Sequence, residues 1–206
     1  MSSVNRNIVL IGSIGRDQSH FGQNLAEKFG WQFVDTDRVL EGCYGLPIAE
    51  IYRKLGEKGF RRAEMDLLKK VCLYHEAVIS FGGNFPIEMK TLRGLKKYSY
   101  IIGIRAAKYR IVNRVNRRVG KRPTMDYTDV AGFVHTMINR WKPVYRKCDF
   151  IIDTTHGRTH DLIERIKQEL GAQEVIFKKR RLKQAGKWQG RNRSESDDNQ
   201  KVEVID

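Results

Sequence analysis

Residues 8–19 read IVLIGSIGRDQS, and this stretch decides the fold. Its first four residues are aliphatic, and so short an aliphatic run is typical of a strand that is buried on both faces. Glycines follow at positions 12 and 15, and residues 19–29 favour a helix. A buried strand that runs through a glycine turn into a helix is typical of an α/β fold with a parallel sheet.

The loop between this strand and helix can be compared with a phosphate-binding loop, G-x-x-x-x-G-K-[ST]. In that motif the glycines let backbone N–H groups point at phosphates, the lysine reaches the transferred phosphoryl group and the hydroxyl holds Mg²⁺. Gly12, Gly15 and Ser19 are in place, whereas Asp17 replaces the second signature glycine and Gln18 replaces the lysine. The loop is therefore either a degenerate phosphate site or a turn that contains glycine for steric reasons alone.

Four more short apolar runs follow along the chain, separated by stretches of helical character. We predict strands at 8–11, 32–35, 77–80, 100–104 and 150–153. We predict helices at 19–29, 48–55, 59–74, 107–119, 128–146 and 161–170. This alternation predicts an α/β fold with a five-stranded parallel sheet, helices on both faces and ligands at the carboxyl ends of the strands.

The composition limits the class of protein. Of 206 residues, 40% are hydrophobic and 31% are charged, which favours one globular domain over a disordered or fibrous chain. The sequence has neither an apolar run long enough to span a bilayer nor an apolar signal segment. The three cysteines are odd in number and lack C-x-x-C spacing, so neither a disulfide framework nor a zinc site is implied. We expect a cytoplasmic monomer that does not contact membranes.

The net charge of +15 is concentrated in one segment. Residues 105–147 include 12 basic and 2 acidic residues, whereas residues 177–206 include 9 basic and 5 acidic residues. Such a segment suggests a polyanion, either nucleotide phosphates or a nucleic acid, with a solvated helical face as the alternative. Because residues 177–206 are polar and charged, we predict a folded domain over 1–176 and a disordered tail that contacts nucleic acid or is simply solvated.

Further motifs, taken in order, resemble those of the shikimate kinase family of small P-loop kinases. The segment WQFVDTD at 31–37 is similar to the second strand of the family and the D-T-D motif that ends it. The segment GEKGFR at 56–61, together with Glu64, is similar to the family motif G-E-x-x-F-R-x-x-E. SFGGN at 80–84 keeps two glycines of its triplet, and KRP at 121–123 lies at the place of the R-P of its lid. PVY at 143–145 and Asp153-Thr154 are similar to its closing motifs. The resemblance covers residues 7–170 and implies a P-loop kinase fold and phosphoryl transfer from Mg²⁺-ATP to the 3-hydroxyl of shikimate.

On the substrate side, the resemblance implies that Asp37 binds the hydroxyl groups and is a candidate catalytic base. Arg61 would clamp the carboxylate, and Gly82 and Gly83 would allow a close approach to the backbone. Arg140 is the candidate second clamp, because the arginine that the family carries two residues before the proline of P-x-Y is replaced here. Arginines suit carboxylates because their planar fork donates two parallel hydrogen bonds.

On the nucleotide side, the implied residues come from the loop and the lid. They are Gly12, Gly15, Arg16, Gln18, Ser19, Arg118 and Arg122. Arg122 would also reach the transferring phosphoryl group, which makes it a candidate catalytic residue. The Ser19 hydroxyl would hold Mg²⁺, and Asp35 would orient the ion through water. Local alternatives stay open: Asp35 could cap a turn, Arg61 could pair with Glu57 or Glu64, and the glycines could form a bare turn.

Three functions follow as hypotheses. The first is a shikimate kinase, and the second is a pseudokinase that binds ligand without productive transfer. The second is favoured by Asp17 and Gln18, since one cation on the transition state is worth about 10³-fold or more. Whether Arg16 compensates is left open. The third hypothesis is a nucleic-acid-associated basic protein.

Overall fold

A computed structural model describes residues 7–12, 17–71, 73–82, 87–116 and 128–171. The chain divides after Thr159 into two compact units, which are described separately. The first unit holds the sheet and its helices, and the second is helical over residues 160–171. The predicted boundary after residue 176 lies outside the described residues.

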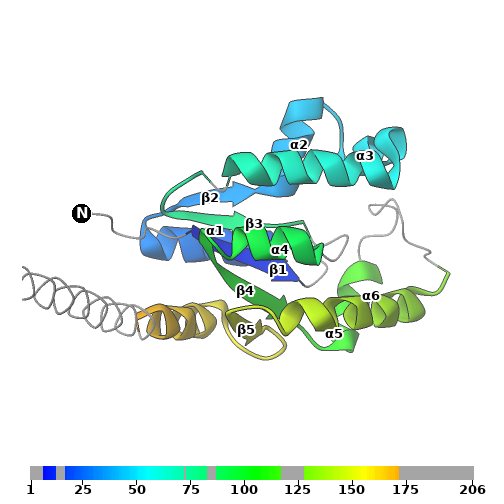
Figure 1. The fold of residues 1–206 in the computed structure, drawn as a ribbon. Helices are drawn as coiled ribbons and strands as arrows, with labels where there is room; N and C mark the ends of the chain where they lie inside the picture. Colours follow the sequence, from blue (N-terminus) through cyan, green and yellow to red (C-terminus); the bar gives the residue numbers. More distant parts are fainter. Residues whose placement is uncertain (1–6, 13–16, 72, 83–86, 117–127, 172–206) are drawn as a thin grey trace, which may run out of the picture. The chain divides into compact units, whose positions relative to one another are not determined.

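Five parallel strands form one sheet in the order β2-β3-β1-β4-β5 (Figure 1). The strands are β1 (Asn7–Gly12), β2 (Gln32–Asp35), β3 (Ala77–Ser80), β4 (Ser99–Arg105) and β5 (Phe150–Asp153). The central strand β1 is buried at every residue and pairs with β3 and β4. The predicted five-stranded parallel sheet is confirmed.

The helices of the first unit are α1 (Asp17–Phe29), α2 (Thr36–Tyr44), α3 (Ile48–Val71), α4 (Met89–Leu95), α5 (Lys108–Asn116) and α6 (Val130–Tyr145). Two of them, α2 and α4, were not predicted. The break predicted between residues 55 and 59 is a kink at Gly56, whose φ of 64° suits a residue without Cβ. Among the described residues, no helix is both long and apolar enough to cross a membrane.

Helices cover both faces of the sheet, as predicted. On one face, Gly22 of α1 packs against Leu10 and Phe33. On the other face, Val9 and Ile11 belong to one buried apolar cluster with residues of α3, α4 and α6. Since both faces are apolar and covered, polar side chains gather at the carboxyl ends of the strands.

Candidate active site

Asp37 and Gly82 lie in contact just beyond the carboxyl ends of β2 and β3. Helix α2 begins directly after β2 because Asp35 caps it, with Oδ1 accepting from the N–H of Asp37 at 3.1 Å. The Thr36 hydroxyl donates to the Ser80 carbonyl at 3.1 Å and accepts from the Gly82 N–H at 3.0 Å. A Cβ on Gly82 would collide with the Asp37 carboxylate, so this close approach requires glycine. The contact joins two residues predicted for the substrate site.

Arg61 and Glu64 add an ion pair from α3 to the same site. Arg61 Nη1 lies 3.1 Å from Glu64 Oε2, and the exposed fractions of the two side chains are 20% and 6%. Burial raises the pKa of Glu64, Arg61 lowers it, and the negative charge of Asp37 raises it again, to about 7. Because the charge of Asp37 acts on Glu64, α2 and α3 bring these two carboxylates close together. The sequence pattern marked Glu64 only as a motif residue and gave no sign of this titration.

A cavity of about 20 Å³ lies beside this ion pair, which is room for about one water molecule. Arg61 and Glu64 line it together with Glu88 at the start of α4. The remaining lining residues, most of them apolar, are Met65, Leu68, Phe81, Ile87 and Thr91. These walls explain why ionising Glu64 is costly, since they offer its carboxylate little compensation for lost water.

Gln18, at the lysine position of the loop motif, is buried with 4% of its surface exposed. Its Nε2 donates to the Leu10 carbonyl at 2.7 Å and to the Phe81 carbonyl at 2.9 Å. The carboxamide therefore ties the carboxyl end of β1 to the residue after β3. In this arrangement both amide hydrogens are used within the fold, so a nucleotide contact would need Oε1 or the loss of these bonds.

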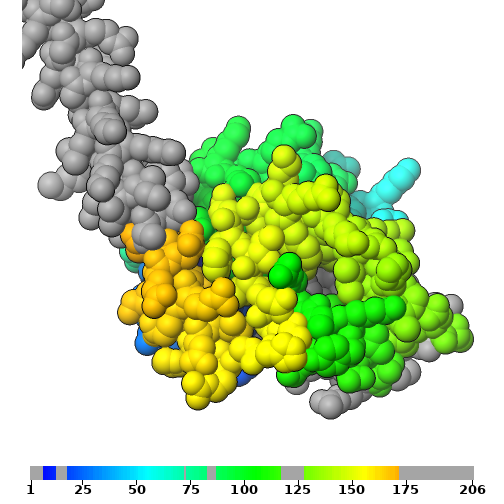
Figure 2. All heavy atoms as spheres, turned by 90° about the horizontal axis from the view of Figure 1, so that it is seen from below, coloured from blue at the N-terminus to red at the C-terminus, as the bar shows by residue number. Residues whose placement is uncertain are grey.

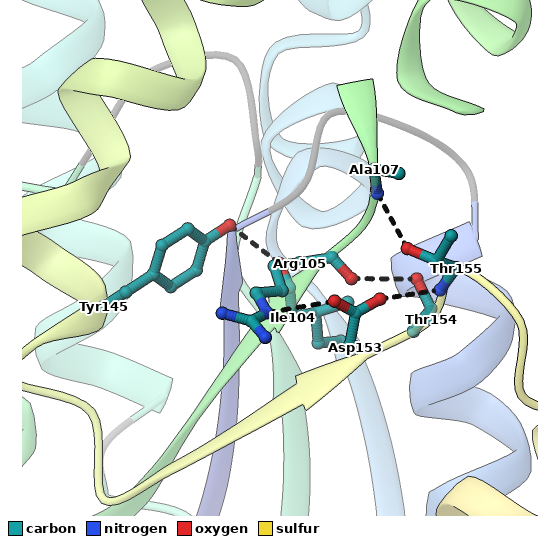
Figure 3. A network of polar contacts seen from close by, with 7 residues as sticks. All are labelled: Ile104, Arg105, Ala107, Tyr145, Asp153, Thr154 and Thr155. Atoms are coloured by element: carbon teal, nitrogen blue, oxygen red, sulfur yellow. Dashed lines mark hydrogen bonds and ion pairs between the residues drawn. The ribbon is translucent and has the colours of Figure 1, made fainter. Parts of the chain in front are cut away.

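Gly12 ends β1 at a point where the chain leaves no room for a side chain. Its φ is 108°, and a Cβ would lie 2.5 Å from both the Ile104 carbonyl and the Tyr145 hydroxyl. That hydroxyl donates to the Ile104 carbonyl at 2.8 Å (Figure 3). The start of the loop is thus held close against β4 and α6.

A second polar network joins the chain segments after β4 and β5 (Figure 3). Arg105 Nε donates to Asp153 Oδ2 at 3.1 Å, and the Thr155 N–H donates to Asp153 Oδ1 at 2.9 Å. The Ala107 N–H donates to Thr155 Oγ1 at 2.8 Å. Burial opposes ionisation of Asp153, but the hydrogen bonds from Thr155 and the charge of Arg105 lower its pKa. The sequence motif included Asp153 but did not indicate Arg105 and Thr155 as its partners.

The same architecture is found in known proteins. The sequence profile of shikimate kinases matches residues 16–171. The chain belongs to the shikimate kinase family. It is 32% identical over 164 residues to the shikimate kinase of Thermodesulfovibrio yellowstonii, an alignment covering 80% of this chain and 94% of the relative. It is 28% identical over 163 residues to a shikimate kinase of Thermus thermophilus, covering 79% and 89%.

Solved shikimate kinases share the fold. The shikimate kinase of Acinetobacter baumannii in complex with shikimate superposes with a TM-score of 0.76 at 26% identity, covering 82% of this chain and 95% of that one. The shikimate kinase of Aquifex aeolicus superposes with a TM-score of 0.71 at 23% identity, covering 82% and 98%. The prediction of a P-loop kinase fold of the shikimate kinase type is confirmed.

Several predicted site residues of this family member lie outside the described residues. They are Gly15, Arg16, Gly83, Arg118 and Arg122. Their roles stay predictions. Of the residues predicted to bind the nucleotide, the described part of the chain includes Gly12, Gln18 and Ser19. Ser19 lies in the first turn of α1.

The predicted second clamp, Arg140, is exposed on α6 beside a buried tryptophan. Trp141, at the position where the resemblance leads one to expect arginine, is 2% exposed and stacks on Tyr145 with ring centroids 5.9 Å apart. Its Nε1 has no hydrogen-bond partner among the described residues. At this position the chain therefore carries a neutral, buried donor in place of a cation.

Ser19 and Asp35 are oxygen donors of the kind that Mg²⁺ prefers. One oxygen of Asp35 already accepts from the N–H of Asp37 as the cap of α2. In the described ranges, no group of three or more histidine, cysteine or acidic residues is arranged to hold a metal ion. A Mg²⁺ ion held by Ser19 and Asp35 would take its other ligands from nucleotide phosphates and water, and the roles of these two residues stay predictions.

Proposed function

We propose that the chain transfers the γ-phosphoryl group of ATP to the 3-hydroxyl group of shikimate. The observation that carries this proposal is the meeting of Asp37, Gly82, Arg61 and Glu64 at the carboxyl edge of the sheet. A small polyol carboxylate needs a cation for its carboxylate and an acceptor for its hydroxyl groups, within a few ångströms. Family membership and the likeness to a shikimate-bound kinase support this choice of substrate.

Each residue of the substrate side would have a separate task. Arg61 would donate to the carboxylate of shikimate, and Asp37 would accept from a hydroxyl group and take its proton during transfer. Gly82 would allow the ring to approach the backbone, and a Cβ at this position would displace the Asp37 carboxylate. Arg140, from the exposed face of α6, remains a candidate for a second carboxylate contact.

On the nucleotide side, the loop after Gly12 and the lid residue Arg122 would surround the phosphates. Ser19 and Asp35 would hold Mg²⁺, which supplies positive charge to the phosphate oxygens when it is bound. The network of Arg105, Asp153 and Thr155 would keep the neighbouring edge of the sheet rigid. Positioning of this kind is most of what a phosphoryl-transfer site contributes.

A second candidate function is ligand binding without transfer, and the bonding of Gln18 favours it. The side chain at the lysine position is neutral, buried and hydrogen-bonded to the Leu10 and Phe81 carbonyls. A transferring phosphoryl group would then meet no cation from this position, and one such cation is worth about 10³-fold or more in rate. The pocket for shikimate does not depend on that cation.

The release of ADP separates the two candidates. The full chain is incubated with Mg²⁺-ATP, with and without shikimate, and calorimetry measures shikimate binding in parallel. Shikimate-dependent ADP release supports the kinase, whereas binding without release supports the second candidate. Absence of binding contradicts both. Arg61→Ala should abolish binding, and Arg62→Ala, the exposed neighbour on α3, is the matched control that should leave it intact.

The loop variant Asp17→Gly with Gln18→Lys tests the source of any defect. It removes a carboxylate and adds a cation, so a non-transferring protein should gain ATP affinity and shikimate-dependent ADP release. If the natural chain already turns over and the double variant gains nothing, another cation serves the phosphates. Arg16→Ala should then be severely deleterious.

A further inference from the structure

We propose that the shikimate site takes up its anionic ligand together with a proton, and that Glu64 is the group that receives the proton. The inference rests on the proposed function, because it concerns the same pocket. It deepens that proposal by assigning the ionic form of the complex.

Charges of both signs act on Glu64. On α3, Arg61 lies 3.1 Å from Glu64. From α2, Asp37 acts on Glu64 with the same sign of charge, and Glu88 at the start of α4 lines the adjoining cavity. Arg61 is the single cation among the described residues that line this cavity or act on Glu64. Of the two charges that act on Glu64, one therefore favours its ionised form and the other opposes it before any ligand arrives.

The surroundings leave Glu64 little other compensation. Its side chain is 6% exposed, and the cavity beside it has room for about one water molecule. Apolar side chains of Leu68, Phe81 and Ile87 form much of the cavity wall. An ionised Glu64 would thus depend on Arg61, the residue that the ligand carboxylate also needs.

Ligand binding removes this competition when Glu64 is protonated. A carboxylate placed on Arg61 adds negative charge beside Glu64, which favours the neutral acid. Burial and the charge of Asp37, opposed by Arg61, raise the pKa of Glu64 to about 7. At neutral pH the ligand-free site is therefore partly ionised, and binding completes its protonation. Above pH 7, the affinity for shikimate should fall by up to about tenfold per pH unit. The fall should end at the pH at which Glu64 loses its proton in the complex as well.

The test is calorimetric titration of shikimate into the full chain at pH 7.5. The titration is repeated in phosphate and in Tris buffers, whose ionisation enthalpies differ. Protons taken up by the protein are released by the buffer, so the difference in binding heat between the two buffers gives the number of protons taken up per shikimate. The natural chain should take up between about half a proton and one proton per shikimate. Glu64→Gln should take up none, and its affinity should stay flat between pH 6.5 and 8.5. Asp66→Asn is the matched control, since Asp66 also forms an i,i+3 ion pair on α3 but is exposed.

Each outcome decides between the claims. Shikimate binding without proton uptake by the natural chain overturns this inference and leaves the proposed function standing. Uptake that persists in Glu64→Gln, folded as judged by circular dichroism, also overturns it. Absence of shikimate binding in the natural chain overturns the proposed function itself. The buffer series on the natural chain needs no variant, so a misfolded Glu64→Gln does not remove the test.

Discussion

Gln18 occupies a motif position but makes structural bonds. The carbonyls of Leu10 and Phe81 accept its two amide hydrogens at 2.7 and 2.9 Å, and the side chain is buried. A buried amide whose two hydrogens are both bonded stabilises the fold, whereas its loss leaves the two carbonyl groups with fewer partners.

Gln18→Met should therefore lower the free energy of unfolding by about 1 to 3 kcal/mol, because the volume is kept and the two hydrogen bonds are lost. Chemical denaturation measures the change. Gln23→Met is the matched control, since Gln23 lies on the exposed side of the same helix and should change stability by less than about 0.5 kcal/mol. Equal effects of the two variants would contradict the structural role of Gln18.

The raised pKa of Glu64 predicts that the stability of the fold depends on pH. Its pKa rises from the ordinary 4.5 to about 7 on folding, so the folded state holds this proton more tightly than the unfolded state. Its contribution to stability is complete below pH 4.5 and is lost as the pH rises through 7. Relative to Glu64→Gln, the natural chain should therefore lose about 2 to 3 kcal/mol of unfolding free energy between pH 5 and 8.

Denaturant unfolding at pH 5, 6.5 and 8 measures this difference. Asp66→Asn should show no such slope, because the pKa of the exposed Asp66 is lowered from 3.8 and its titration ends below pH 5. A difference between natural chain and Glu64→Gln that is independent of pH would show that Glu64 is ionised throughout.

At the scale of elements, the end of β1 depends on the absence of a side chain at Gly12. Gly12→Ala should destabilise the protein strongly, because φ is 108° and the new Cβ would overlap the Ile104 carbonyl and Tyr145 hydroxyl. Gly30→Ala is the matched control, since Gly30 also has a positive φ, 66°, but nothing lies within 4 Å of the position that its new Cβ would take. Thermal unfolding should show a several-fold larger loss for Gly12→Ala, and similar losses would argue against close packing there.

The elements also show how far sequence reasoning reaches. The strands were predictable because aliphatic runs such as that of β1 are buried on both faces. Helix α2 was missed because its cap, Asp35, was assigned as a motif residue, and α4 is a short helix whose N-cap residue makes no side-chain cap bond. The contact of Asp37 with Gly82 follows from the meeting of parallel strands at one edge. Predicting the pairing of Arg105 with Asp153 would have required the register of β4 against β5. Predicting the raised pKa of Glu64 would have required knowledge of its burial.

At the scale of the whole molecule, the excess positive charge has two separable locations. Helices α5 and α6 lie side by side on one surface (Figure 2). Their exposed basic residues include Lys108, Arg110, Arg140 and Lys142. The other location is the basic stretch within residues 177–206, which the sequence pattern assigns to a tail.

Deletion of residues 177–206 should leave shikimate affinity unchanged, since every proposed substrate contact lies before residue 141. The same deletion should weaken any retention on RNA and reduce its dependence on salt. Filter binding at two salt concentrations checks this expectation. Tight, salt-sensitive RNA binding that survives the deletion would instead assign nucleic-acid binding to α5, α6 and the residues between them.

The most direct test of the central claim is calorimetric titration of shikimate into the full chain without ATP. We expect saturable one-site binding by the natural chain, because the proposed contacts of shikimate with Asp37, Gly82 and Arg61 do not involve the nucleotide. We also expect no measurable binding by Arg61→Ala. Absence of binding by the natural chain, or equal affinity in Arg61→Ala, would contradict the assignment of this pocket to shikimate.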